Sequence, residues 1–582
     1  MDARPADRPA PAREPRRRRF VDTLLYGRDV DRTVKTRARI GLAILVFAIG
    51  YAVIAARLVM FAAVPDGQGS RRIGGHDAVA TARPDILDRN GEILATDVRT
   101  PSLFGEPHRI IDVDEASELL TAVMTDIDAA ELRKRLGSKR RFVWLKREIT
   151  PKQREQIHRL GIPGIGFLPE NNRIYPNGAE VSHLVGHVNI DNQGIAGIEK
   201  WLDARGLADL HLAGLASDRL QKPVELAVDL RVQHAMRDEL VAARTKFKAL
   251  AVAGLLTDVR TGEIISMVSL PDYNSNNPRE ALDPTRINRL TTGVFEMGST
   301  FKALTVAMAL DSGKITLKSS FDARGGLHYG KFTIHDFHAQ NRVLTVPEIF
   351  TYSSNIGTAR MALSLGVEHH KWFLRKIGQL ERLRTELPES AEPLVPRRWG
   401  ELNTVTIAFG HGLSVAPLQA VAAIGALMNG GRLIPPTFLK RSEQEAMALA
   451  TQVVKPETSD KMRYLMRLNV EKGTATKADV KGYYVGGKTG TSEKVVGGRY
   501  SKTKVLTSFT AVMPSDQPRY LLLIMLDEPQ ATPETHGYAT SGWNAVPVGG
   551  AVIGRIAPLL GLEPRFELPP ADKLILSSAG GR

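Results

Sequence analysis

The sequence of 582 residues contains no cysteine. Disulfide bonds, thiolate metal sites, iron–sulfur clusters and cysteine nucleophiles are therefore excluded. The chain also lacks a glycine-rich loop of the Walker or dinucleotide-binding type, so no nucleotide cofactor is indicated. Hydrophobic residues make up 43% and charged residues 24% of the chain, which is typical of a globular protein rather than a disordered or fibrous one. At this length we expect roughly two to four domains.

Long hydrophobic runs are also scarce, and a single run is long enough to cross a membrane. It comprises residues 40–64, with Arg57 as its only charged residue. At ~1.5 Å per residue it spans roughly 37 Å, enough for a hydrocarbon core of ~30 Å. It is too long, and starts too late, for a cleaved signal peptide. We therefore predict a transmembrane signal anchor at residues 40–64; a buried soluble helix is the alternative.

Acidic residues are in the minority, with 63 Asp and Glu against 78 Lys and Arg, a formal net charge of +15. Residues 1–39 hold 12 basic and 6 acidic residues, including the run Arg16-Arg17-Arg18-Arg19. Because this tail borders the apolar run, the positive-inside rule predicts a cytoplasmic N-terminus with everything after Val64 outside. A nucleic-acid-binding arm is the alternative, and the absence of interleaved aromatic residues argues against it.

The part outside the membrane is predicted to hold two domains that divide near Lys222. Residues 65–222 are rich in Gly, Arg and turn signals, and indicate an extended α+β region, called the pedestal below. Residues 223–563 indicate a second α+β domain, and residues 564–582 a C-terminal tail. The apolar patterns in the second domain predict strands at 224–230, 251–257, 263–269, 485–491, 508–513 and 520–526, and helices at 232–247 and 299–310. Sequential strands favour an antiparallel meander, so we expect an antiparallel sheet covered by helices.

The run Ser299-Thr300-Phe301-Lys302 places a hydroxyl and an amine three residues apart at the start of a predicted helix. Residues at this spacing lie on the same helix face, so Ser299 is a candidate nucleophile beside Lys302 as a candidate base. The same pattern occurs at Ser501 to Lys504, which we interpret as coincidental.

Two further motifs follow, 54 and 189 residues after Ser299. In the first, Ser353 can pass a proton between Lys302 and a leaving group, and Asn355 can hold a peptide substrate. The second, Lys488-Thr489-Gly490-Thr491, falls on a predicted edge strand. There Lys488 and Thr489 can bind a carboxylate, Gly490 admits a substrate backbone, and a backbone N–H of Thr491 can donate to an oxyanion. Penicillin-recognising serine enzymes carry three motifs in this order.

With these motifs the sequence resembles the class B penicillin-binding proteins, and most of all the division-specific peptidoglycan D,D-transpeptidases of FtsI type. The resemblance covers nearly the whole chain. It includes the pedestal segments 83–91, 173–176 and 197–199, and the segments 410–412 and 417–419 of the predicted second domain. Pro84, His411 and Ala416 depart from the residues common in the family, Gly, Tyr and Thr.

The resemblance implies a serine β-lactamase-like catalytic domain on a dimerisation-type pedestal. Ser299 would form an acyl-enzyme with a peptidoglycan stem peptide, release D-Ala, and pass the acyl group to an amine, while β-lactams would acylate Ser299 as inhibitors. It further implies a single-pass inner-membrane protein with a periplasmic catalytic domain, active at the septum with division proteins such as a FtsW-type glycosyltransferase. No cofactor, metal or nucleic acid is implied.

Several alternatives stay open at this point. They are an elongation-specific class B transpeptidase, a D,D-carboxypeptidase, a serine β-lactamase, and a catalytically inactive division scaffold. A bifunctional enzyme is disfavoured because residues 65–222 contain no acidic motif resembling a glycosyltransferase. His183 and His187 lie four residues apart, but no Glu of the zinc-protease type stands between them, so we interpret them as structural. The cluster of His328, His335 and His338 beside Asp336 has no clean metal-ligand spacing and does not indicate a metal site.

Overall fold

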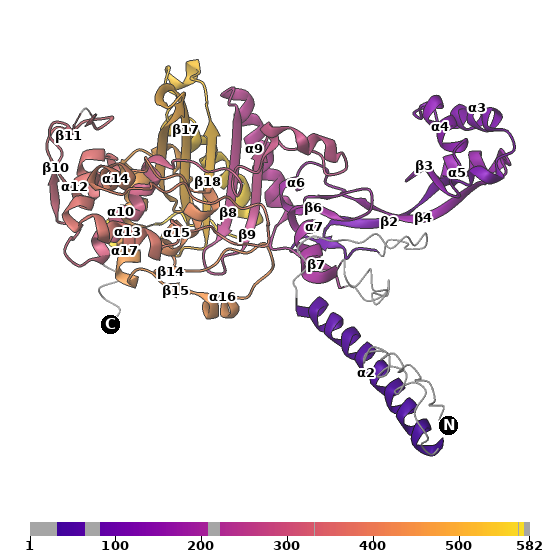
Figure 1. Ribbon diagram of the computed structural model, residues 1–582. Helices are drawn as coiled ribbons and strands as arrows, with labels where there is room; N and C mark the ends of the chain where they lie inside the picture. Colours follow the sequence, from indigo (N-terminus) through magenta and orange to yellow (C-terminus); the bar gives the residue numbers. More distant parts are fainter. Residues whose placement is uncertain (1–31, 64–81, 208–221, 331, 569, 575–582) are drawn as a thin grey trace, which may run out of the picture. The chain divides into compact units, whose positions relative to one another are not determined.

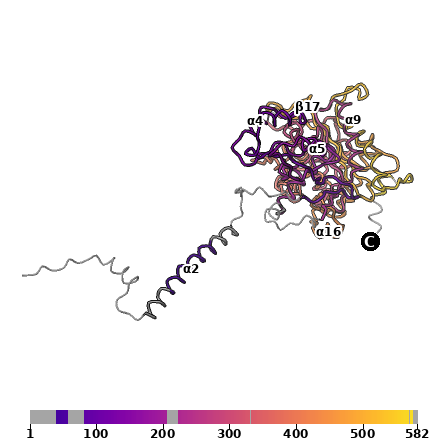
Figure 2. Tube along the Cα trace, turned by 90° about the vertical axis from the view of Figure 1, so that its right-hand side faces the viewer, coloured from indigo at the N-terminus to yellow at the C-terminus, as the bar shows by residue number. Residues whose placement is uncertain are grey.

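The computed structural model describes residues 32–63, 82–207, 222–330, 332–568 and 570–574. Residues 1–31 of the predicted basic tail and residues 575–582 of the predicted C-terminal tail lie outside the described residues. The chain divides into two compact units, Met1–Asp77 and Ala78–Arg582. In the first unit, helix α2 runs unbroken over Arg32–Ala63 (Figures 1 and 2). Over the described residues, no helix combines the length and apolarity that a membrane crossing requires.

The second unit begins with a long two-stranded ribbon in the pedestal. Strands β2 (Ile93–Gly105) and β4 (Ile165–Ile174) pair antiparallel along their length (Figure 1). Short strands extend this sheet: β1 (Ile86–Leu87), β3 (Val143–Lys146) and β7 (Val224–Glu225). Helices α3 (Val113–Val123), α4 (Ala129–Leu136) and α5 (Pro151–Arg159) surround one end of the ribbon. Leu103, Leu120 and Leu132 form the small apolar core there.

A buried ionic network holds the other end of the ribbon. Arg173 of β4 donates from Nε to Oε1 of Glu199 at 2.6 Å, and Arg83 donates from Nε to Oε2 at 2.8 Å. Arg173 also donates to Asp97, and neither Arg173 nor Glu199 is exposed. Burial alone would lower the pKa of Arg173, but Glu199 and Asp97 outweigh it and raise that pKa. Glu199 lies in α7 (Gly197–Leu202), so the network ties two segments far apart in sequence.

Removing Glu199 should leave two buried guanidinium groups without their shared partner. We expect Glu199→Ala to destabilise the pedestal by about 3–5 kcal/mol, the cost of breaking a buried ion pair. The matched control is Glu155→Ala, which breaks an exposed pair with Arg159 one turn away and should cost below ~0.5 kcal/mol. Thermal and urea unfolding measure both; equal midpoints in the two variants would contradict this assignment.

The larger part of the second unit is built on a five-stranded antiparallel sheet in the order β16-β17-β18-β8-β9. The strands are β8 (Ala251–Asp258), β9 (Ile264–Leu270), β16 (Gly486–Val496), β17 (Arg499–Met513) and β18 (Tyr520–Asp527). Every residue of β8, β9 and β18 is buried. Alternate side chains enter opposite cores, because successive residues of a strand point to opposite faces: Leu521 and Leu523 enter one core, Leu522 and Ile524 the other.

Helices cover both faces of this sheet (Figure 1). Helices α9 (Leu230–Lys246) and α18 (Ala545–Leu559) pack on one face, and α10 (Lys302–Asp311), α15 (Pro417–Met428) and α17 (Pro456–Lys472) on the other. The remaining helices are α6 (Ser182–Val185), α11 (Val346–Thr351), α12 (Asn355–Leu365), α13 (Val367–Lys376), α14 (Glu401–Ala408) and α16 (Glu443–Leu449). Four small two-stranded sheets are described: β5 (His187–Val188) with β6 (Gly194–Ala196), β10 (Ser320–Asp322) with β13 (Val343–Thr345), β11 (Leu327–Tyr329) with β12 (Phe332–Ile334), and β14 (Arg432–Leu433) with β15 (Thr451–Gln452).

The α+β class, the strands predicted at 251–257 and 263–269 and the C-terminal meander are confirmed. The strand predicted at 224–230 is wrong beyond Glu225. From Leu226 onward the chain forms only an isolated bridge to Leu439, and the Asp229 side chain then caps the N-terminus of α9. An apolar run of this length does not by itself distinguish a strand from an extended entry into a helix.

Candidate active site

Ser299 lies, half-buried, in a 3₁₀ turn at Gly298–Phe301, and the α-helix α10 begins only at Lys302. The prediction of a helix starting at Ser299 is therefore wrong by one turn. Gly298 has φ +54°, and a Cβ there would lie 2.9 Å from the Thr491 carbonyl oxygen. A Cβ on Gly410 would lie 1.9 Å from the Gly298 carbonyl oxygen. The Ser299 turn is thus wedged between β16 and the loop at Gly410, where only glycine fits.

Lys302 is 1% exposed and its amine is surrounded by the second motif. Its Nζ donates to the Ser353 backbone oxygen at 2.5 Å, to Ser353 Oγ at 3.0 Å and to Asn355 Oδ1 at 2.8 Å. Asn355 Nδ2 donates to the backbone oxygen of His335 at 3.0 Å. The first and second sequence motifs are therefore in direct contact.

Lys488 enters the same cluster from the third motif. It is fully buried, and its Nζ lies 3.1 Å from Ser353 Oγ and 5.5 Å from the ring centroid of Phe350. Ser353 Oγ thus contacts both lysines. Strand β16 lies at the sheet edge, as the sequence predicted, with Gly490 packed against the Ser299 turn: a Cβ there would lie 2.8 Å from the Met297 carbonyl oxygen.

Burial changes the charge state of both amines. It lowers the pKa of Lys488 to about 7. Burial, and then repulsion from Lys488, hold the pKa of Lys302 well below its usual range, against a smaller opposing effect of Asp336. Desolvation disfavours the charged form of an amine, so Lys302 is suited to accept a proton at neutral pH.

Asp336 positions the second motif, a role that the sequence spacing did not reveal. Its Oδ2 accepts from Ser354 Oγ at 2.6 Å and its Oδ1 from the Ile356 amide at 2.9 Å. These bonds hold the turn in which Ser353 adopts φ +58°, a left-handed conformation that is costly for a residue with a side chain. Asp336 stood out in the sequence only as a neighbour of three histidines, which gives no hint of this contact.

A second set of residues missed in the sequence supports the third motif. Thr489 Oγ1 lies 2.7 Å from Thr474 Oγ1, and Thr474 donates to Asn469 Oδ1 at 3.2 Å. Asn469 Nδ2 in turn donates to the Gly487 backbone oxygen at 2.8 Å. Thr491 Oγ1 accepts from the Ser541 amide at 3.2 Å. The Thr489 hydroxyl is therefore oriented by the end of helix α17.

A third group of contacts surrounds Glu296, which precedes the Ser299 turn in the sequence. Glu296 Oε1 accepts from the Gly412 amide at 2.8 Å and from Tyr500 OH at 3.0 Å. Burial raises the pKa of Glu296, and burial, followed by the charge of Lys302, lowers the pKa of His411 to about 4. His411 is thus a neutral ring at pH 7. It packs edge-on against Tyr500 at 5.7 Å.

A half-buried serine before a helix, two desolvated lysines and a shared hydroxyl define a serine acyl-transfer site of the penicillin-recognising class. Comparisons with known proteins agree. Residues 252–546 match the penicillin-binding protein transpeptidase domain, and residues 78–205 match the penicillin-binding protein dimerisation domain.

Two curated relatives and one solved structure extend the match. The chain is 40% identical to a probable peptidoglycan D,D-transpeptidase FtsI of Caulobacter vibrioides, over 86% of this chain and 85% of the relative. It is 31% identical to a probable peptidoglycan D,D-transpeptidase PenA of Neisseria gonorrhoeae, over 93% and 96%. A peptidoglycan synthetase from Bifidobacterium adolescentis shares the fold with a TM-score of 0.65 at 23% identity, over 84% and 98%. The chain therefore belongs to the class B penicillin-binding proteins, and among them to the FtsI-like peptidoglycan D,D-transpeptidases.

The lowered pKa of Lys488 has a measurable consequence for stability. Between about pH 7 and pH 10 the unfolded chain binds a proton at this amine that the folded chain does not, so this group makes the fold less stable as the pH falls through that window. We expect Lys488→Met to be more stable than the wild type by several degrees near pH 7, with a difference that shrinks toward pH 10.

Thermal unfolding across this pH range measures the effect, with the exposed Lys502→Met as the matched control. A Lys488→Met advantage that stays constant from pH 7 to pH 10 would refute the lowered pKa of Lys488.

Proposed function

We propose that this protein cross-links peptidoglycan stem peptides through an acyl-enzyme on Ser299. The observation that carries the assignment of roles is the contact of Ser353 Oγ with both Lys302 and Lys488. It offers a continuous path for a proton between the helix that follows Ser299 and the edge strand β16.

In the first half-reaction, neutral Lys302 takes the hydroxyl proton of Ser299 as Oγ attacks the penultimate D-Ala carbonyl. The amides of Ser299 and Thr491 would hold the oxyanion, a contribution of ~10²–10³ in rate for each donor. The bond to the terminal D-Ala then breaks, and the proton moves from Lys302 through Ser353 to the departing amine.

The substrate carboxylate would lie against Lys488 and Thr489. A bound carboxylate favours the charged form of Lys488, whose pKa of about 7 lets it gain a proton at little cost. Asn355 would hold the peptide. In the second half-reaction an amine of another stem peptide attacks the ester, and its proton passes back through Lys302 to Ser299 Oγ.

We place the chain in the inner membrane, anchored by residues 40–64 with residues 1–39 in the cytoplasm. The apolar composition of the segment and the basic tail support this topology, and helix α2 covers most of the segment. The pedestal, residues 65–222, and the catalytic domain, residues 223–563, would then lie in the periplasm. Division proteins, including a FtsW-type glycosyltransferase, are the partners that the family membership suggests.

Replacing Ser299 tests the nucleophile. Ser299→Ala should abolish the covalent adduct with a fluorescent penicillin on a denaturing gel, because no other hydroxyl of the cluster can form the acyl-enzyme. The matched control is Ser501→Ala, which removes the serine of the second Ser-x-x-Lys pattern, on strand β17, and should label at the wild-type rate. A labelled Ser299→Ala protein would refute the assignment.

With stem-peptide substrates, cross-linked dimers indicate transfer, whereas trimmed monomers would indicate a carboxypeptidase.

The cellular role is tested by depletion. If the protein acts at the septum, depleted cells should elongate into filaments, because septal cross-linking stops while the side wall still grows. A fluorescent fusion should then lie at midcell, and the Ser299→Ala chain should fail to restore division. Rounded cells would instead support the elongation role.

A further inference from the structure

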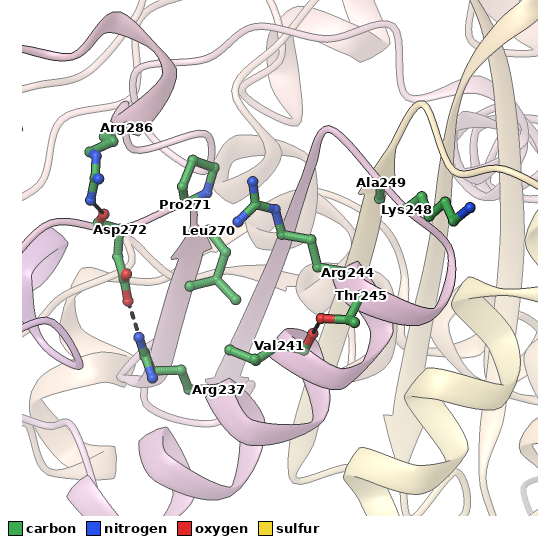
Figure 3. Close-up of a pocket in the computed structure, with 10 residues that line it drawn as sticks. All are labelled: Arg237, Val241, Arg244, Thr245, Lys248, Ala249, Leu270, Pro271, Asp272 and Arg286. Atoms are coloured by element: carbon green, nitrogen blue, oxygen red, sulfur yellow. Dashed lines mark hydrogen bonds and ion pairs between the residues drawn. The ribbon is translucent and has the colours of Figure 1, made fainter.

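A polar cavity of about 560 Å³ lies beside strand β9 and the C-terminal half of helix α9 (Figure 3). Its lining comprises Arg237, Val241, Arg244, Thr245, Lys248, Ala249, Leu270, Pro271, Asp272 and Arg286. Strand β9 is the edge opposite to β16. At about 4.8 Å between neighbouring strands, the two edges are roughly 19 Å apart. The cavity therefore shares no residue with the candidate active site.

The lining is strongly cationic. It holds three arginines and one lysine against a single carboxylate, Asp272. That carboxylate is already engaged, because Arg237 Nε donates to its Oδ2 at 2.8 Å. Arg286 donates to the backbone oxygen of Asp272 and pairs with Glu280 at 3.2 Å and Asp283 at 3.6 Å. Two of the four cations thus have internal partners that hold them in place.

The other two cations, Arg244 and Lys248, have no ion pair or side-chain hydrogen bond within the described part of the chain. Figure 3 shows the Arg244 guanidinium extending from α9 across Leu270, between the Arg237–Asp272 pair and Lys248. A further arginine, Arg289, is 8% exposed and donates to the Thr285 backbone oxygen. Burial lowers the pKa of Arg289, and nearby Arg244 adds to that effect against the charge of Asp527. Among the described residues of the lining, Arg244 and Lys248 are therefore the two cations without a partner carboxylate.

We propose that this cavity binds a phosphate or diphosphate group of a larger ligand. Arginine forks bind phosphate oxygens in a bidentate manner, and a phosphate ester carries about −1.5 to −2 charges at pH 7. A ligand with a single carboxylate carries one negative charge, which is less than the positive charge of Arg244 and Lys248 together. The volume falls within the ~300–1,000 Å³ typical of small-molecule sites, so the ligand extends beyond the phosphate. A soluble phosphorylated compound and an anionic lipid headgroup share this chemistry.

The test is calorimetric titration of pyrophosphate into the full-length protein in a neutral detergent. We expect Arg244→Gln to weaken binding at least tenfold, since it removes a charged fork that has no ion-pair partner in the described part of the chain. The matched control is Lys246→Gln, an equal charge change on an exposed residue of the same helix outside the cavity. Both variants should react with penicillin at the wild-type rate, which verifies the fold independently of the cavity.

Absence of pyrophosphate binding at millimolar concentration, or equal weakening by the two variants, would overturn the proposal. A second titration, in mixed micelles with phosphatidylglycerol or with phosphatidylcholine, distinguishes the ligand sources. If phosphatidylglycerol weakens pyrophosphate binding and phosphatidylcholine does not, the cavity binds a lipid headgroup. If neither lipid changes pyrophosphate binding, the cavity binds a soluble phosphorylated ligand.

Discussion

The burial of two lysine amines around one serine hydroxyl is the constraint on which the rest of the catalytic unit depends. Lys302 and Lys488 would each hold a proton in water, yet they lie almost fully inside the protein with Ser353 Oγ between them. Desolvation lowers both pKa values, and repulsion from Lys488 lowers that of Lys302 further, which supplies a base at neutral pH but opposes folding. The apolar sheet and its two helical layers must stabilise the fold enough to offset that cost.

In the pedestal, in contrast to the lysine cluster, the buried cations are paired with carboxylates. Arg173 is as inaccessible as Lys302, but Glu199 and Asp97 accept from its guanidinium, and its pKa rises. A buried charge that is paired with opposite charges holds two segments together, whereas a buried amine without such a partner has a lowered pKa and can take part in chemistry. The same burial therefore serves structure at one end of the unit and chemistry at the other, according to whether carboxylates lie within reach.

The fold was predictable where strands and helices follow local apolar patterns. Strands β8, β9 and β18 and helix α9 appear within two residues of their predicted bounds, whereas β16 ends five residues later and β17 begins nine residues earlier than predicted. The predictions failed where contacts distant in sequence decide the backbone. The 3₁₀ turn at Ser299 lies where Gly298 closely approaches Thr491 and Gly410, which are distant from it in sequence. No periodicity in residues 298–310 carries that information.

The three motifs, their order and the residue types proposed for the chemistry can be read from the amino-acid sequence, because these are properties of composition and spacing. The folded arrangement instead sets the charge states of Lys302 and Lys488, since a pKa depends on burial and on neighbours from other segments. It alone brought Asp336 to Ser354, and Asn469 and Thr474 to the third motif. It also gathered the arginines of the β9 cavity, which lie up to 49 residues apart in the sequence.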